Sequence, residues 1–171
     1  MTISTKDQHE LTVFAEFAAA ALCGERHDGG ESCVPPEPDI FFRSSRNPRY
    51  FELGRLLDTE HSRTVLKALR QAPACVTPDL TKIKLPEREV LQAKLLKTYD
   101  SRGLPIELLL YFDAEHRHLE GSLPPIDFPV HAEFVMVPLL RASMGAFSRV
   151  GVFERYRHSV LWQFEVEHGD A

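Results

Sequence analysis

The segment that most constrains the fold is the run IELLLYFD at residues 106–113. Its residues are almost continuously apolar, whereas a strand with one face in water alternates apolar and polar residues. A continuous apolar run of this length is typical of a strand that is buried on both faces. Such a strand needs a covering layer on each side, so the sequence predicts a central sheet covered by helices.

Three segments have the features of those helices. In residues 6–25, the side chains of Leu11, Phe14, Ala18 and Leu22 recur at helical spacing, and Gly24 ends the pattern. Residues 60–70 form a second apolar-periodic segment. Residues 86–99 form a third, which begins with a proline suited to a first helical turn. We expect a helix in each segment.

The remaining strands are predicted on either side of these helices. Residues 39–42 and 50–57 are short apolar segments joined by the turn-like sequence RSSRNPR, and a helix after them allows a parallel crossover to residues 106–113. Residues 131–141 fit either a strand or a helix, and we favour a short helix at 137–144. Residues 147–156 and 159–166 resemble a closing hairpin that turns near Arg157. The predicted fold class is therefore α/β or α+β, with a mixed central sheet flanked by helices.

Length and composition predict one soluble domain over residues 1–171. The chain is 43% hydrophobic and 26% charged, has no apolar run long enough to span a bilayer, and begins without a secretory signal. We expect a cytoplasmic protein without a membrane partner. The three cysteines are an odd number, which disfavours a disulfide framework. Cys23, His27 and Cys33 suggest a zinc site, but no CxxC pair supports it and GERHDGGES between them resembles a loop, so free thiols are favoured.

The charge balance bears on nucleic-acid binding in two ways. A formal net charge of -5 argues against a large duplex footprint, because phosphate neutralisation supplies most of the affinity of such complexes. A small acidic catalytic cleft with local basic residues remains compatible with that charge. Arg43, Arg46 and Arg49 lie in one turn and either contact phosphates or form an ordinary charged turn, and the sequence favours neither.

Two carboxylates on neighbouring strands suggest metal chemistry. Asp39 follows a proline at the start of one predicted strand, and Glu52 lies within the next, so a hairpin would bring them together. Magnesium sites in proteins use one or two carboxylates plus water. Glu16, on the preceding predicted helix, is a candidate third acid. The alternative is that Asp39 only begins a strand and Glu52 faces solvent.

This order of elements resembles the PD-(D/E)XK restriction-endonuclease-like superfamily. The resemblance rests on the helix with Glu16, the "PD" strand with Asp39, the FELGRLLD strand with Glu52, and the later LLLYFD strand. It implies a mixed four-stranded core sheet flanked by helices, with metal ligation by Asp39 and Glu52 and a supporting role for Glu16. The superfamily usually has lysine where this chain has Gly54.

A narrower likeness suggests where the missing amine lies. The chain resembles a little-characterised bacterial branch whose second strand reads like E-V-T-R-L and whose amine is thought to come from the following helix. In EVLQAKLLKTYD this implies Lys94, with Lys97 nearby. Arg55 is a weaker substitute because neighbouring strand residues point to opposite faces.

The resemblance therefore implies a Mg²⁺-dependent nuclease or phosphodiesterase, a hydrolase acting on nucleic acid, or a relative that has kept the scaffold and lost the chemistry. The alternative is a non-enzymatic interaction or regulatory protein on the same scaffold. In that alternative, apolar residues of the closing hairpin pair an edge strand with another chain, such as a second copy in a homodimer. The candidate residues for that contact are Phe153, Val160, Leu161 and Trp162.

Overall fold

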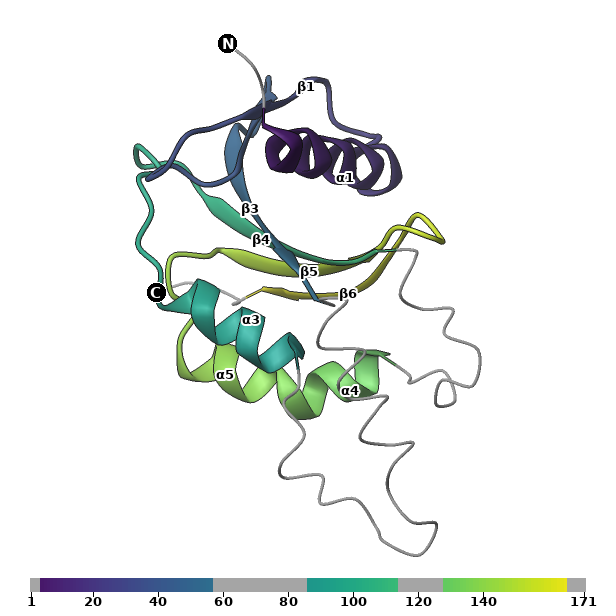
Figure 1. The fold of residues 1–171 in the computed structure, drawn as a ribbon, viewed down its shortest axis with the longest axis vertical. Helices are drawn as coiled ribbons and strands as arrows, with labels where there is room; N and C mark the ends of the chain where they lie inside the picture. The colour runs from purple at the N-terminus through teal and green to yellow at the C-terminus, as the bar shows by residue number, and fades with distance from the viewer. Residues whose placement is uncertain (1–3, 57–85, 114–127, 166–171) are drawn as a thin grey trace, which may run out of the picture.

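The computed structural model describes residues 4–56, 86–113 and 128–165, which form a six-stranded mixed sheet with helices on both faces (Figure 1). The described elements are α1 (Thr5–Ala21), β1 (His27–Ser32), β2 (Ile40–Ser44), β3 (Arg49–Arg55), α3 (Pro86–Leu95), β4 (Ile106–Phe112), α4 (Phe128–Val135), α5 (Val137–Ala142), β5 (Arg149–Glu154) and β6 (Ser159–Glu165). This architecture confirms the predicted α+β class with a mixed sheet.

The strands are arranged in sequence order, β1-β2-β3-β4-β5-β6. β3, β4 and β5 are parallel to one another, and the pairs at either side are antiparallel. β4 is central, and all seven of its residues are buried. The buried apolar run therefore lies where the sequence predicted it, and the predicted parallel pairing of β3 with β4 is also observed.

Alternation along the strands creates two apolar cores. One lies between the sheet and α1, where the Phe14 ring packs against the Phe51 ring at a centroid distance of 4.9 Å. The other lies under α3, α4 and α5, around Leu91, Leu108 and Met136. Glu52, on β3, belongs to the strand positions that face this second core, because its neighbours in sequence face α1. Burial on both faces supplies most of the stabilisation of such a fold.

Several boundaries differ from the sequence-based expectations. Residues 27–32, expected within a loop, form the edge strand β1, whose residues are all exposed or half-buried and so give no apolar signal. Gly30 is required there, because a Cβ atom would lie 2.6 Å from the Phe14 ring. The segment that fitted either a strand or a helix is helical, as α4 and α5. The helix α3 ends at Leu95, earlier than expected, and the predicted helix at 60–70 lies outside the described residues.

The hairpin of β5 and β6 is confirmed, with its turn at residues 155–158. Cys23 and Cys33 are free thiols. Within the described ranges, no helix combines the length and the hydropathy needed to cross a bilayer.

Candidate metal site at the edge of β3

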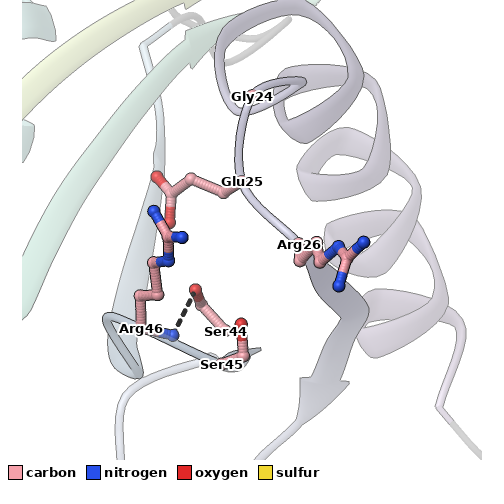
Figure 2. A pocket seen from close by; sticks show the side chains of 6 residues that line it. All are labelled: Gly24, Glu25, Arg26, Ser44, Ser45 and Arg46. Atoms are coloured by element: carbon pink, nitrogen blue, oxygen red, sulfur yellow. Dashed lines mark hydrogen bonds between the residues drawn. The ribbon is translucent and has the colours of Figure 1, made fainter.

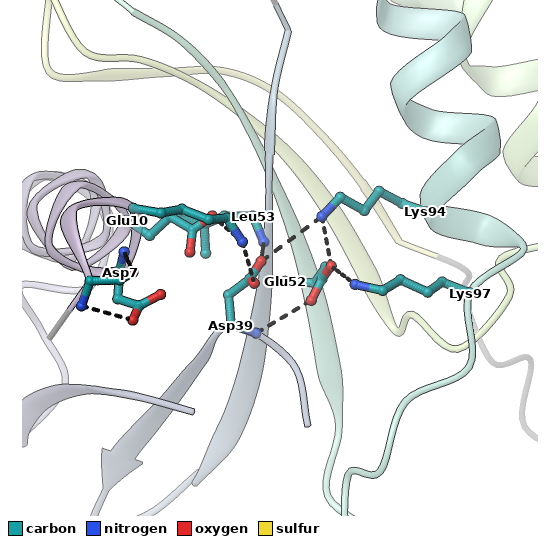
Figure 3. Close-up of polar contacts among 9 residues, drawn as sticks. Asp7, Glu10, Asp39, Glu52, Leu53, Lys94 and Lys97 are labelled. Carbon is teal, nitrogen blue, oxygen red and sulfur yellow. Dashed lines mark hydrogen bonds and ion pairs between the residues drawn. The ribbon is translucent and has the colours of Figure 1, made fainter. Parts of the chain in front are cut away.

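Asp39 and Glu52 lie side by side where β2 begins. Ile40 pairs with Phe51 in the antiparallel register, so Asp39 is the next residue out, directly beside Glu52. The Asp39 amide donates to Glu52 Oε2 at 3.3 Å, and Asp39 Oδ2 accepts the Leu53 amide at 2.8 Å. The Asp39 side chain thus continues the pairing with β3 just before the first residue of β2 (Figure 3). The hairpin brings together the two acids that the sequence singled out.

Two lysines converge on the same carboxylate oxygen of Glu52. Lys94 Nζ lies 2.6 Å from Glu52 Oε1, and Lys97 Nζ lies 2.9 Å from that atom. Lys94 also approaches Asp39 Oδ2 at 3.9 Å, whereas no ion pair of Lys97 with Asp39 is found among the described residues. The Glu52 side chain is fully buried, the Lys94 side chain is 21% exposed and the Lys97 side chain is 54% exposed. Lys94 therefore reaches both acids, as the resemblance implied.

Gly54 makes room for this approach. A Cβ atom at Gly54 would lie 2.6 Å from Leu110 Cδ2, 3.0 Å from Val90 Cγ1 and 3.7 Å from Lys94 Cε. The absence of a side chain lets α3 pack closely across β3, so the aliphatic stem of Lys94 lies over the glycine. At this position a lysine carried by β3 itself would collide with the helix. The glycine and the lysine of α3 are two parts of one packing arrangement.

The first helix brings Glu10, not Glu16, to this site. Glu10 and Lys6 form an i,i+4 ion pair at 3.3 Å, and Lys6 Nζ lies 3.7 Å from Asp39 Oδ1. Glu10 is buried on the same stripe as Val13 and Phe17. The helical spacing of Lys6, Glu10 and Val13 was the signal that sequence reasoning missed, because it placed Glu16 in the site without following the stripe to Glu10.

Glu16 belongs to a different network. Arg155 donates two hydrogen bonds to the Glu16 carboxylate, both at 2.7 Å, and a third to Asp113 Oδ1 at 2.5 Å. Arg55 Nη2 and His9 Nε2 also approach Asp113, at 3.1 and 3.4 Å. These five residues, called the arginine cluster below, join α1 to the ends of the parallel strands. The structure does not bring Glu16 together with Asp39, Glu52 and Lys94.

The pKa shifts in the site reflect crowded carboxylates. Burial, and then the charge of Glu52, raise the pKa of Asp39. Burial, and then the charge of Asp39, raise the pKa of Glu10. Burial also acts to raise the pKa of Glu52, but Lys94 and Lys97 outweigh it and hold that pKa below its usual value. Glu52 is therefore ionised at neutral pH. Ionisation of Asp39 and Glu10 is unfavourable in comparison, because each is buried next to another carboxylate.

Tyr99 completes the wall beside the lysines. Lys97 Nζ lies 5.0 Å from the centroid of the Tyr99 ring, and that ring packs against Phe147 at 5.5 Å. Burial, and then the nearby Glu52 charge, raise the pKa of Tyr99. Its buried hydroxyl makes no well-aligned hydrogen bond within the described part of the chain. The sequence assigned Tyr99 only to an apolar stripe.

The three arginines of the β2–β3 hairpin have three different environments. Arg49 is 2% exposed and is bound by Glu25 and Glu107, at 2.8 and 2.7 Å, so it is unavailable for the phosphate contact that the sequence had left open. Arg43 donates to both carboxylate oxygens of Glu31 at 3.0 Å. Arg46 is exposed and has no ion-pair partner among the described residues. Spacing in the sequence could not separate the buried Arg49 from the exposed Arg46 three positions before it.

The donor set fits a hard divalent cation held partly by water. Asp39 and Glu52 supply adjacent carboxylates, and the raised pKa of Asp39 marks negative charge that a cation would relieve. In the described ranges, no three His, Cys, Asp or Glu side chains gather closely enough to enclose a metal ion. Magnesium keeps several waters and commonly takes only one or two protein carboxylates, which matches this pair.

Fold and site together define a mixed-sheet α+β protein with paired acids and lysines at one strand edge. A scan against models of protein families, a search of curated proteins and a search of solved structures each found no match. The likeness to the PD-(D/E)XK superfamily therefore rests on the residues of this chain alone.

Proposed function

We propose that this protein is a Mg²⁺-dependent phosphodiester hydrolase of the PD-(D/E)XK type, acting on nucleic acid. The observation that carries the proposal is the convergence of Asp39, Glu52 and Lys94 from three separate elements on one strand edge. Two carboxylates and one amine are a minimal set for metal-assisted hydrolysis of a phosphodiester.

Each residue has a role that its chemistry supports. Asp39 and Glu52 would hold the magnesium ion, which supplies a polarised water and neutralises charge on the phosphate. Lys94, on the rigid α3, orients the water or balances the charge that develops on the phosphate. Glu10, in place of the predicted Glu16, is the acid that would orient water beside Asp39.

The balance of three carboxylates and three lysines supports a site whose lysines can exchange a carboxylate for a phosphate. Glu10, Asp39 and Glu52 are matched by Lys6, Lys94 and Lys97, so the cluster carries no net charge when all six are ionised. Lysine forms single-point contacts on a flexible stem, and it gives up one partner for another more readily than arginine. A cation at the acids frees the ammonium groups to meet an incoming phosphate.

A second candidate, a non-enzymatic interaction or regulatory protein, is favoured by how fully the acids are already used. Glu52 accepts hydrogen bonds at both carboxylate oxygens, and Asp39 Oδ2 accepts a backbone amide. That pattern also describes an ion-pair network that only fixes α3 to the sheet. Of the residues expected to pair with another chain, Phe153 is fully buried under α1, and Val160, Leu161 and Trp162 are half-buried against the cores. A homodimer contact would therefore use the open backbone of β6.

The deciding experiment is a calorimetric titration of the full chain with Mg²⁺ and Mn²⁺, together with cleavage assays on single- and double-stranded DNA and RNA. We expect binding and cleavage by the wild type and the loss of both in Asp39→Ala. Glu31→Gln is the matched control, because it removes an exposed carboxylate of β1 that pairs only with Arg43 within the described residues.

The two candidates predict opposite outcomes. A hydrolase loses metal binding in Asp39→Ala and keeps it in Glu31→Gln. The absence of metal binding and cleavage in the wild type rules out the hydrolase and leaves the non-enzymatic scaffold.

A further inference from the structure

A second polar pocket lies at the other end of β2, away from the paired acids. It is lined by two segments, Gly24, Glu25 and Arg26 after α1, and Ser44, Ser45 and Arg46 at the start of the β2–β3 turn, and it has a volume of about 390 Å³ (Figure 2). β2 separates this pocket from Asp39 by five residues, which corresponds to about 17 Å of extended strand. It is therefore a separate site.

The pocket carries positive charge that its own walls do not neutralise. Arg26 and Arg46 are both exposed, and neither has an ion-pair partner among the described residues. Glu25 also lines the pocket, but its two carboxylate oxygens accept hydrogen bonds from Arg49 at 2.8 and 2.9 Å. Those hydrogen bonds hold the pKa of Glu25 below its usual value, so Glu25 is ionised at neutral pH, and it shares Arg49 with Glu107. The two exposed arginines of the pocket wall therefore outnumber its one acid.

The turn supplies further groups that suit an oxyanion. The buried Ser44 hydroxyl accepts the backbone amides of Arg46 and Asn47, each at 3.4 Å, and so fixes the turn that carries Arg46. Ser45 is exposed at the rim and offers a hydroxyl donor. Arginine forks bind phosphate oxygens in bidentate fashion, and hydroxyl groups of serine complete such sites.

We propose that this pocket binds a phosphate group, with Arg26 and Arg46 as its principal ligands. Two sources of that chemistry fit the geometry. One is a free phosphate or phosphomonoester, and the other is the backbone of a nucleic acid whose scissile bond lies at Asp39 and Glu52. Only the second source rests on the proposed hydrolase function. A spacing of about 17 Å equals about five base pairs along the axis of a duplex, at about 3.4 Å per base pair.

The test uses inorganic phosphate and the full chain in EDTA, so that its outcome does not depend on the metal site. Amide chemical shifts are followed in a ¹⁵N-labelled sample, and we expect saturable shifts at residues 24–26 and 44–47. Arg46→Gln and Arg26→Gln should each weaken phosphate binding about tenfold, since each removes charge-assisted hydrogen bonds. Arg46→Lys keeps the charge without the fork and should fall between the wild type and Arg46→Gln.

Arg43→Gln is the matched control. It removes the same charge from an exposed arginine of β2, three positions before Arg46, and we expect binding to be unchanged. An equal loss of phosphate affinity in Arg43→Gln, or amide shifts at Lys94 and Lys97 instead of the turn, would contradict the assignment of the phosphate site to this pocket. So would the absence of saturable shifts in the wild type.

The source of the phosphate follows from a second titration, of fluorescent single- and double-stranded oligonucleotides in EDTA. If Arg46→Gln weakens oligonucleotide binding about as much as phosphate binding, the pocket holds a nucleic-acid backbone. If only phosphate binding changes, the pocket serves a free phosphate or phosphomonoester. Either result supports the phosphate site, and neither requires that the chain cleave anything.

Discussion

Two charged clusters of this protein connect α1 to the sheet, and they use different cations. The cluster at the edge of β3 balances Glu10, Asp39 and Glu52 with three lysines, which contact single carboxylate oxygens. The arginine cluster holds Glu16 in a two-pronged hydrogen-bonded pair with Arg155, which also binds Asp113. A guanidinium fork fixes its partners rigidly, whereas an ammonium on a flexible stem exchanges them.

The pKa shifts separate the clusters in the same way. Hydrogen bonds from Arg155 outweigh burial and lower the pKa of Glu16. Burial and a neighbouring carboxylate raise the pKa of Asp39. The arginine cluster stabilises the ionised form of Glu16, whereas the lysine cluster leaves the ionised forms of Asp39 and Glu10 destabilised. Perturbation of that second kind, where like charges are held together, is more typical of a functional site than of a structural one.

The largest expected effect separates the two lysines. Lys94→Met keeps the stem over Gly54 and removes the ammonium that reaches both acids, so we expect the cleavage rate to fall by about 10² to 10⁴. Lys97→Met removes an ammonium whose one carboxylate partner among the described residues is Glu52, and it should cost less than about tenfold. The measurement is single-turnover cleavage at saturating Mg²⁺, with circular dichroism to verify folding. Equal losses in the two variants would contradict the assignment of Lys94.

Substitutions in the arginine cluster should lower the free energy of unfolding and leave Mg²⁺ binding nearly unchanged. Arg155→Met leaves Glu16 without its arginine and removes one of the two arginines that contact Asp113, whose side chain is only 9% exposed. Breaking a pair of this kind costs about 2 to 4 kcal/mol of unfolding free energy, slightly less than for a fully buried pair because Glu16 is partly exposed. Urea denaturation measures the loss. Mg²⁺ affinity of the folded variant should stay within about twofold of the wild type.

The double variant Glu16→Gln with Arg155→Met sharpens this prediction. Removing both partners of the pair should be less damaging than removing Arg155 alone, because fewer charges are then left unpaired. If the double variant is as unstable as the sum of the single ones, the two residues do not act as a pair.

A glycine tests the packing that places Lys94. Gly54→Ala puts a Cβ atom 2.6 Å from the fully buried Leu110 side chain, so we expect a loss of about 1 to 3 kcal/mol of unfolding free energy together with reduced cleavage. Gly151→Ala is the matched control on β5, where the nearest atom to a new Cβ would be Gln163 Cγ at 3.9 Å. That variant should be neutral or slightly stabilising. A neutral Gly54→Ala would show that α3 does not depend on the glycine.

The sequence predicts the elements whose apolar pattern is strong and misses those defined by contacts. The run at 106–113 is recognisable because both of its faces are buried, and Asp39 and Glu52 are recognisable because a hairpin must bring its strands together. The edge strand β1 is polar on both faces, so it leaves no pattern in the sequence. Its pairing with β2 depends on Gly30 and Phe14, which are distant in sequence.

The site shows the same limit on the first helix. Both Glu10 and Glu16 lie on α1, and only the direction in which the helix packs decides which one meets Asp39. The stripe of Val13 and Phe17 on the buried face contains that information, and it also places Glu10 there. Glu16 is directed to Arg155 by a contact across 139 positions of sequence, which no local pattern encodes.

The smallest expected effect is on the pH dependence of the free energy of unfolding. Both clusters contribute to that dependence, but with opposite signs. The pKa of Glu16 is lowered from 4.5, so its contribution to stability is present above that value and is lost as the pH falls through the lowered pKa. Glu16→Gln should therefore be less stable than the wild type at pH 7, and the difference should shrink on acidification.

Asp39 should behave in the opposite way in metal-free buffer. Its pKa is raised from 3.8, so stability falls as the pH rises from that value through the raised pKa, where the acid becomes ionised beside Glu52. Asp39→Asn keeps an acceptor for the Leu53 amide and removes the charge. It should therefore exceed the wild type at pH 7 by up to about 1 kcal/mol of unfolding free energy, and the gain should vanish in acid.

Magnesium should then reverse the order of the wild type and Asp39→Asn. A cation that binds only the folded wild type stabilises it by about 2.7 kcal/mol at 100 times its Kd, which exceeds the electrostatic gain of the asparagine variant. Glu16→Gln keeps the acids at the edge of β3 and should be stabilised as much as the wild type. Urea denaturation of the three proteins with EDTA or Mg²⁺ gives the comparison. If Mg²⁺ stabilises Asp39→Asn as strongly as the wild type, the ion is not held by Asp39.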